Sequence, residues 1–241
     1  MDYKELIDRN LMEEFKKERE KDQISKNLIA SSSGQCHRKR ILETFIPKEV
    51  DERAMRLFWL GDVIHDKIQS LIPGKYEVHI RGSFLVPEFH FAKENEQKLV
   101  SGKIDILTED EILEIKTVHS RSFSYEVSEH YLFQVITYKE MYRILSGKEM
   151  RTGLIYVSRD DMRVAYIPIV EDVSKSFTEE VVKDWVEIEK EFEQFKEENI
   201  LPEPAPRWDW ECRYCPFAPD CEKGNLKEHI NKNFQKYSAD T

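Results

Sequence analysis

Hydrophobic and polar positions recur along the chain with two different periods, and these periods predict an order of helices and strands. Apolar residues at helical spacing, together with N-cap residues, predict helices at five places: 1–22, 34–45, 51–71, 128–145 and 173–199. Alternation with a period of two predicts strands at six places: 76–80, 82–86, 100–107, 112–117, 152–158 and 163–169. No internal repeat and no low-complexity tract interrupts this order.

Two of the predicted strands, 100–107 and 112–117, carry acidic residues among isoleucines and leucines. A short acidic turn joins them, which indicates an antiparallel hairpin. Side chains on a strand alternate between its two faces, so Glu114 and Lys116 point to the same side. Paired with Asp105 on the first strand, they would place two carboxylates and one ammonium group at one end of a sheet.

These charged groups have two interpretations. Because an unpaired buried charge is costly, the carboxylates of Asp105 and Glu114 are candidate ligands for a divalent ion. Hard ions such as Mg²⁺ and Mn²⁺ prefer carboxylate and carbonyl oxygens, and Lys116 would hold an attacking water or offset charge on a phosphate. The alternative is an ordinary hairpin whose charges face solvent. The strand pattern alone fits both interpretations equally.

Composition restricts the class of protein. The chain has 241 residues, enough for one large domain or two small ones, and 40% of them are hydrophobic, as in globular proteins. Its net charge is −10, so a nucleic acid would have to bind a local basic patch. The charged N-terminus does not resemble a signal peptide and no long apolar run is present, so we expect a cytoplasmic protein. The acidic helix predicted at 173–199 would repel DNA and is interpreted as scaffold facing away from a substrate.

A basic cluster follows the first cysteine. Cys36 is predicted in the first turn of a helix, where the free backbone N–H groups favour a thiolate. Arg38, Lys39 and Arg40 come directly afterwards in the densest run of cations in the chain. Such a run is commonly a solvated helix face. The alternative is a DNA-binding element that contacts phosphates beside a metal centre.

Two further polar pairs stand at helical spacing. Gly61 and His65 share one face of the helix predicted at 51–71, and Gln134 and Tyr138 share one face of the helix at 128–145. A helical histidine or tyrosine is commonly structural. In company with the acidic hairpin, His65 is a candidate metal ligand, and Gln134 and Tyr138 are candidates for ordering the site.

The remaining cysteines lie close together near the end of the chain. The spacing Cys212-x2-Cys215-x5-Cys221 suits a metal held from a tight turn, and Cys36 is the fourth cysteine. In a reducing compartment, disulfides are disfavoured. Zinc is the usual occupant of four cysteines, but the one-plus-three arrangement and the neighbouring aromatic residues favour a [4Fe–4S] cluster. Either metal would fasten the end of the chain to the helix near Cys36.

Taken together, these pieces resemble the RecB-like branch of the PD-(D/E)XK nuclease superfamily, and most closely the CRISPR-associated Cas-four iron–sulfur nucleases. The resemblance runs from Ser31 to Cys221 and keeps the order of the family's motifs. Those motifs are one early cysteine, Gly61-x3-His65, Gly102-x2-Asp105, Glu114-Ile115-Lys116, Gln134-x3-Tyr138 and three late cysteines. The chain departs from the family's motif at Ile104, because the motif has a proline directly before the aspartate.

The resemblance implies an α/β (α+β) fold of the restriction-endonuclease type, with a mixed central sheet flanked by helices. It implies one nuclease domain over 1–241, in which 1–50 and 200–225 form the cluster-bearing region and 226–241 is a tail. It assigns Mg²⁺ or Mn²⁺ to four ligands, His65, Asp105, Glu114 and the carbonyl of Ile115. Lys116 would polarise the attacking water, with Gln134 and Tyr138 in support. Cys36, Cys212, Cys215 and Cys221 would hold the [4Fe–4S] cluster.

The function that follows is hydrolysis of DNA phosphodiester bonds, as an exonuclease or endonuclease on single strands or frayed ends. The family analogy adds trimming of spacer precursors in CRISPR adaptation, with CRISPR adaptation proteins as partners. A stand-alone nuclease of repair or recombination remains open. A hypothesis of a different class is a DNA-binding assembly module without catalysis, which the acidic net charge favours.

Overall fold

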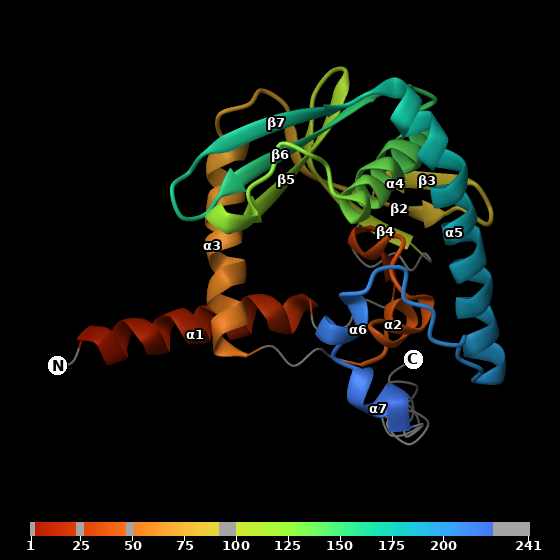
Figure 1. The fold of residues 1–241 in the computed structure, drawn as a ribbon, viewed down its shortest axis with the longest axis horizontal. Helices are drawn as coiled ribbons and strands as arrows, with labels where there is room; N and C mark the ends of the chain where they lie inside the picture. The colour runs from red at the N-terminus through yellow and green to blue at the C-terminus, as the bar shows by residue number, and fades with distance from the viewer. Residues whose placement is uncertain (1–2, 23–26, 47–50, 92–99, 224–241) are drawn as a thin grey trace.

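A mixed β-sheet forms the centre of the molecule (Figure 1). The computed structural model describes residues 3–22, 27–46, 51–91 and 100–223. Its strands are β1 (Leu28–Ile29), β2 (Lys75–Ser83), β3 (Glu88–Phe91), β4 (Val100–Leu107), β5 (Glu111–Val118), β6 (Arg151–Ser158) and β7 (Val164–Ile169). The strand order is β3-β2-β4-β5-β6-β7, and β1 pairs with β4 beside this path. The β1–β4 and β5–β6 pairs are parallel and the other pairs are antiparallel.

Helices flank the sheet. They are α1 (Tyr3–Asp22), α2 (His37–Leu42), α3 (Glu52–Gln69), α4 (Glu129–Ser146), α5 (Glu171–Glu198), α6 (Glu211–Tyr214) and α7 (Ala218–Lys223), with short 3-10 turns η1 (Ala30–Ser32) and η2 (Ser120–Ser122). In Figure 1, α3 stands beside one end of the sheet, whereas α4 lies between the sheet and α5. The predicted mixed α/β fold with a central mixed sheet flanked by helices is confirmed.

Alternate residues of β6 explain why both faces are covered. Ile155 packs in one hydrophobic cluster with Ile64 and Ile68 of α3. Its neighbour Leu154 points to the other side and packs in a separate cluster with Val135 of α4. Successive side chains of a strand point to opposite faces, so a strand that is apolar at both positions requires a helix on each side.

The sheet forks where β4 and β5 meet. Their antiparallel register is limited to Ile106 opposite Leu113 and Leu107 opposite Ile112. At its other end, β4 pairs instead with β1, through residues 100 and 101. The strands β4 and β5 therefore separate at the level of residues 105 and 114, and no described backbone ladder fills that part of the fork.

The largest hydrophobic cluster joins α5 to residues between Leu28 and Ile46. Trp185 of α5 is fully buried and stacks on Phe84, with ring centroids 5.7 Å apart. The guanidinium of Arg40 lies 4.1 Å from the centroid of Trp185, and the indole Nε1 donates to Thr137 Oγ1 at 2.9 Å. The helix α2, the turn after β2, and the helices α4 and α5 therefore form one packed unit.

Most predicted elements are confirmed, and two are wrong in detail. The residues predicted to cap the second helix lie in or beside η1, and α2 begins only at His37, with Cys36 as its N-cap. The predicted strand at 82–86 is also wrong, because β2 continues to Ser83 and the chain then turns before β3. Glu189 of α5 fixes this turn by accepting the backbone N–H of Phe84 at 2.7 Å.

The acidic helix is more than an outward-facing scaffold. Two of its carboxylates, on Asp184 and Glu189, point into the protein and are 7% and 0% exposed. Asp184 accepts from Arg40, and Glu189 accepts from the turn after β2. These two residues therefore give α5 a packing role inside the protein in addition to the predicted role as scaffold.

No helix in the described ranges combines the length and the apolar character needed to cross a bilayer. The predicted tail, 226–241, lies outside the described residues.

Candidate active site and cysteine cavity

The two acidic residues of the hairpin meet inside the fork between β4 and β5. Asp105 and Glu114 are 6% and 3% exposed, so both carboxylates are buried. Asp105 Oδ2 accepts the backbone N–H of Ile115 at 2.8 Å, which bridges the strands where the ladder stops. The charge of Asp105 acts on the pKa of Glu114, so the two carboxylates are close together, and the alternative of charges facing solvent is wrong for them.

A hydrogen-bonded network surrounds Glu114. Its Oε1 accepts from Lys116 Nζ and from Gln134 Nε2, each at 2.6 Å. Lys116 Nζ also donates to Gln134 Oε1 at 2.8 Å, and Gln134 Nε2 donates to Tyr138 Oη at 3.1 Å. Gln134 and Tyr138 are one helical turn apart on α4, so this helix carries both polar groups to the carboxylate. Four of the predicted site residues therefore form one contiguous cluster.

His65 reaches the same fork from the opposite helix. Its Nδ1 lies 3.6 Å from Asp105 Oδ2, and its side chain is 25% exposed. Gly61, one turn earlier on α3, faces β5: a Cβ at that position would lie 3.4 Å from Thr117 Oγ1. The structure thus brings His65 to the carboxylates as predicted, through a helix that packs on the strand carrying Glu114.

Burial governs the protonation of this cluster. Desolvation and the neighbouring Asp105 charge raise the pKa of Glu114 to about 8, against the lowering effect of Lys116. Desolvation also raises the pKa of Asp105, although His65 and the Ile115 N–H oppose this. The pKa of Lys116 is raised because two carboxylates outweigh its burial. At neutral pH the site therefore holds a proton that a cation could displace.

The donor set fits a divalent ion. Glu114 Oε2 is buried and makes no hydrogen bond, so one carboxylate oxygen faces the fork without a partner. An unpaired buried acceptor is costly, and a hard cation relieves that cost. In the present conformation, no three His, Cys, Asp or Glu side chains of the described residues stand close enough to hold one ion. Loading would therefore require rotation of side chains, with His65, Asp105 and Glu114 as the available ligands.

The glycine of the aspartate motif has a packing role. A Cβ at Gly102 would lie 2.9 Å from the ring of Tyr138 and 3.0 Å from Ala30. Contacts of this length require a neighbour to move, so a larger residue would push α4 away from β4. Gly102 therefore allows the helix that carries Gln134 and Tyr138 to approach the strand that carries Asp105.

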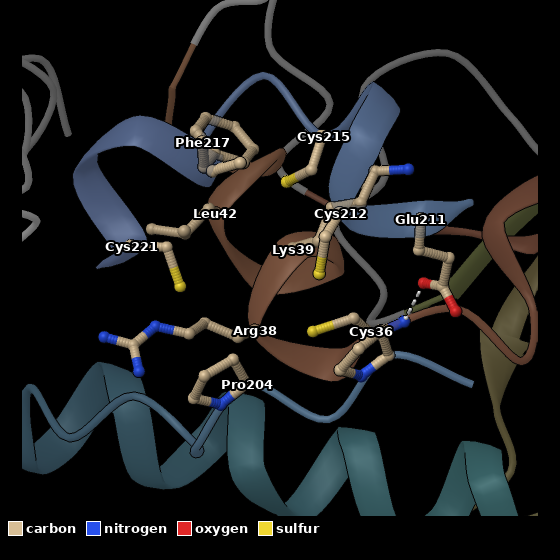
Figure 2. A pocket seen from close by; sticks show the side chains of 12 residues that line it. Cys36, Arg38, Lys39, Leu42, Pro204, Glu211, Cys212, Cys215, Phe217 and Cys221 are labelled. Carbon is tan, nitrogen blue, oxygen red and sulfur yellow. Dashed lines mark hydrogen bonds between the residues drawn. The ribbon is translucent and has the colours of Figure 1, made fainter. Parts of the chain in front are cut away.

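The four cysteines, which are distant from the residues of the fork in the sequence, lie around one cavity. Figure 2 shows Cys36 on one side and Cys212, Cys215 and Cys221 on the other, with their sulfur atoms directed into the space between them. The cavity has a volume of about 180 Å³. All four are free thiols, and burial raises the pKa of the Cys215 thiol. The predicted one-plus-three grouping is present as a spatial cluster.

A hydrogen bond holds the two sides of this cavity together. The backbone N–H of Cys36 donates to Glu211 Oε2 at 2.7 Å, as Figure 2 shows. The other oxygen of Glu211 accepts the backbone N–H groups of Arg207 and Trp208 at 2.7 and 3.0 Å. Glu211 is 2% exposed. This buried carboxylate therefore clasps the late cysteine segment to the start of α2.

One residue of the basic run after Cys36 is not available to DNA. Arg40 is 2% exposed and its Nη1 pairs with Asp184 Oδ2 at 2.7 Å, so its prediction as a DNA-binding residue is wrong. The physical reason is the neighbouring acidic helix, which neutralises Arg40 inside the core. Arg38 and Lys39 line the cysteine cavity instead. Their role in binding DNA stays a prediction.

Sequence patterns missed several residues that shape the site. Gln69 Nε2 donates to the carbonyl of Asp105 at 3.1 Å and so fixes β4 against α3. The ring of Tyr131 lies beneath Lys116, with Nζ 5.0 Å from the ring centroid. Each of these residues lies one helical turn from a motif residue. Gln69 is one turn from His65, and Tyr131 is one turn from Gln134. This helical spacing is the sequence signal by which they could have been identified.

The fold and this order of residues define the class. A sequence model of the PD-(D/E)XK nuclease superfamily matches residues 3–222. The chain belongs to the PD-(D/E)XK nuclease superfamily, whose members use divalent metal ions such as Mg²⁺ or Mn²⁺. The resemblance to the superfamily is confirmed, whereas the RecB-like branch and the Cas-four likeness remain predictions. No curated protein sequence matches the chain.

Several solved structures are similar to this chain. The structure titled SSO0001 aligns with 89% of this chain and 95% of its own, at a TM-score of 0.54 and 20% identity. LHK-Exo, an alkaline exonuclease from Laribacter hongkongensis, aligns with 72% of this chain and 93% of its own, at 0.44 and 14%. A putative exonuclease from Eubacterium rectale aligns with 67% and 60%, at 0.41 and 12%. The likeness to SSO0001 concerns the fold alone, and the two weaker likenesses carry no inference.

Proposed function

We propose that this protein is a metal-dependent DNA nuclease that hydrolyses phosphodiester bonds at the fork between β4 and β5. The observation that carries the proposal is Glu114, a buried carboxylate with one oxygen bound to Lys116 and the other oxygen unpartnered. A structural ion pair would satisfy both oxygens. A carboxylate that has one unpaired oxygen and lies beside a lysine is suited to bind a cation and a polar substrate.

Each residue of the fork then has a role. His65, Asp105 and Glu114, with the carbonyl of Ile115, would hold Mg²⁺ or Mn²⁺. When bound, such an ion lowers the pKa of a coordinated water and offsets charge on the phosphate. Lys116 lies beside Glu114 and would orient the attacking water or stabilise charge developing on the phosphoryl oxygens.

Two residues of α4 support the lysine. Gln134 touches both Lys116 and Glu114, so it fixes the position of the ammonium group relative to the carboxylate. The hydroxyl oxygen of Tyr138 in turn accepts from Gln134 Nε2, and burial with nearby carboxylates keeps the pKa of Tyr138 well above its usual value. Its hydroxyl therefore stays protonated, and we infer that both residues position the site.

The substrate we propose is single-stranded DNA or a frayed duplex end, cut as an exonuclease or endonuclease. A buried fork admits a flexible single strand more easily than a rigid duplex. We further propose trimming of spacer precursors in CRISPR adaptation, in the cytoplasm and together with adaptation proteins, on the basis of the motif resemblance. A stand-alone repair or recombination nuclease would use the same site.

For the cysteine cavity we propose a [4Fe–4S] cluster rather than a single zinc ion. Zinc needs its four ligands about 2.3 Å from one point, whereas a four-iron cluster fills a larger space. The thiols line a cavity of about 180 Å³ without three of them converging on one ion. Arg38 and Lys39 in the lining also suit the negative charge of a thiolate-bound cluster.

The test of the nuclease proposal is cleavage of labelled single strands with Mg²⁺ or Mn²⁺. We expect Lys116→Ala to lower the cleavage rate by about 100- to 1,000-fold, because it removes the only ammonium group hydrogen-bonded to Glu114 in the described structure. A matched control is Lys183→Ala, an exposed lysine of α5, which should cleave like the wild type. Equal cleavage by the wild type and Lys116→Ala would identify a contaminant, and DNA binding without any turnover would favour the assembly module.

A second prediction concerns the cysteines. Cys36→Ala is expected to lower the melting temperature and the soluble yield more than the cleavage rate of the folded protein, because the cavity joins the end of the chain to α2. The test would measure the melting temperature by calorimetry and the iron content of the same samples. It would also measure the absorption of a thiolate-bound cluster at roughly 400 nm. A variant with unchanged melting temperature but no activity would contradict a stapling role.

A further inference from the structure

A continuous row of aromatic rings leads from the catalytic lysine to the cysteine-bearing segment. Lys116 Nζ lies 5.0 Å from the ring centroid of Tyr131, and the ring of His130 lies 3.9 Å from that of Tyr131. His130 in turn meets Trp210 at 5.4 Å and Trp208 at 5.8 Å. The row therefore begins inside the fork and ends on the loop just before α6.

The two tryptophans form an ordered pair at the far end of the row. Their rings are parallel within 3° with centroids 5.7 Å apart, and both are half-buried. Trp208 packs against the main hydrophobic cluster and lies 5.9 Å from Phe133, which leaves Trp210 as the outer ring. The buried Nε1 of Trp208 makes no hydrogen bond, so burial of this indole N–H is not compensated by a polar contact.

The surroundings of the row are unusual for a hydrophobic core. His130 lies between Tyr131, whose ring contacts Lys116, and the two tryptophans, and both burial and the Lys116 charge lower the pKa of His130. Its imidazole is therefore neutral at neutral pH and offers a flat, uncharged face. Rings that are flat, half-exposed and placed beside a cation are suited to a ligand with a π-face on one side and a negative group on the other.

A nucleotide has that chemistry. The ammonium group of Lys116 marks the place of the reacting phosphate, and the rings of His130 and Trp210 lie beyond Tyr131 along the row. Resting on the proposed nuclease function, we propose that His130 and Trp210 form a stacking site for the base of a nucleotide next to the scissile phosphate of single-stranded DNA. The site selects unpaired bases, because a base in a duplex is already stacked and paired.

This site also accounts for the position of the cysteine segment. Trp210 is the residue directly before α6, which carries Cys212, and Glu211 clasps the same turn to Cys36. The cysteine cavity therefore fixes the outer wall of the base site, and Trp210 reaches the row only while that turn is in place.

The test compares Trp210→Ala with Tyr214→Ala, a matched loss of an aromatic ring from α6 that is 71% exposed and outside the row. On single-stranded substrate, Trp210→Ala is expected to raise KM by about tenfold to a hundredfold, and Trp210→Phe to restore most of it. One abasic position next to the cleaved bond should raise KM of the wild type by a similar factor. It should have no further effect on Trp210→Ala, because the two changes remove the same contact.

A second readout does not depend on cleavage. In EDTA, binding of a single-stranded oligonucleotide would be measured by fluorescence anisotropy, and Trp210→Ala should bind more weakly than Tyr214→Ala. The slope of log affinity against log salt should be the same for both variants, because neither loses a phosphate contact. His130→Ala should behave like Trp210→Ala, and all variants should keep the wild-type melting temperature.

The results separate the two proposals. Failure of the wild type to cleave would overturn the nuclease function, whereas the anisotropy result would still decide the base site. The base site would be overturned if Trp210→Ala and Tyr214→Ala had equal KM and equal DNA binding. It would also be overturned if the effects of the abasic position and of Trp210→Ala were additive. Neither result would affect the proposed nuclease function.

Discussion

Glu114→Gln is expected to abolish metal-dependent cleavage and, at the same time, to raise the melting temperature of the metal-free protein at about pH 9. The loss of activity should be about 1,000-fold or more, because an amide is a poor ligand for Mg²⁺ and Mn²⁺. The gain in stability follows from burial, which raises the pKa of Glu114 to about 8. Above that pH the wild type must keep a second buried negative charge beside Asp105.

The pH dependence has a definite sign. An unfolded glutamate ionises near its ordinary pKa, so the folded state binds more protons between about pH 4.5 and pH 8 and stability falls as the pH rises through that window. The advantage of Glu114→Gln should therefore be small at about pH 5 and reach about 2 to 8 °C at about pH 9. Added Mg²⁺ should remove the difference by stabilising only the wild type.

Calorimetry in EDTA and in Mg²⁺ at these two pH values measures both effects. Glu187→Gln, on an exposed glutamate of α5, serves as the control and should match the wild type under every condition. A variant that melts below the wild type at the higher pH would show that Glu114 stabilises the fold as an ordinary ion-pair partner.

Arg40→Ala is expected to cost about 3–5 kcal/mol of unfolding free energy. The substitution leaves Asp184 buried without its main counter-charge and removes the cation stacked on Trp185. Burial opposes ionisation of Asp184, but Arg40 and His37 hold its pKa far below the ordinary value. Chemical denaturation would measure the loss.

Two further variants identify the cause. Arg151→Ala removes an arginine whose ion pair with Asp110 is exposed, and it should cost less than about 1 kcal/mol. Adding Asp184→Asn to Arg40→Ala should recover part of the loss, because the stranded carboxylate is then neutral. If Arg40→Ala instead keeps wild-type stability and binds DNA weakly, the arginine contacts DNA after all.

The sequence predicted which side chains gather in the fork, because local periodicity determines this grouping. Strand alternation places Glu114 and Lys116 on one side, and a tight acidic turn brings Asp105 opposite them. Helical spacing carries Gln134 and Tyr138 together. Each of these relations spans a few residues, so it can be read without knowledge of the tertiary structure.

The contacts that could not be predicted from the sequence are those between residues far apart in the chain. Arg40 and Asp184 are separated by 144 positions, and nothing near Arg40 reveals that an acidic helix will bury it. The same holds for the hydrogen bond from Cys36 to Glu211 and for the meeting of His130 with Trp210. Burial of a charged residue depends on which distant element covers it, and a run of cations carries no information on that point.

The two-residue strand β1 gives the molecule an interlocked architecture. Leu28 and Ile29 pair with the start of β4, and the next residue, Ala30, packs at Gly102 on the same strand. The segment that leads to Cys36 is thus part of the same sheet that carries Asp105. In evolution, the cysteine-bearing region would be difficult to exchange as an independent unit, because its replacement would also remove a neighbour of the strand that carries Asp105.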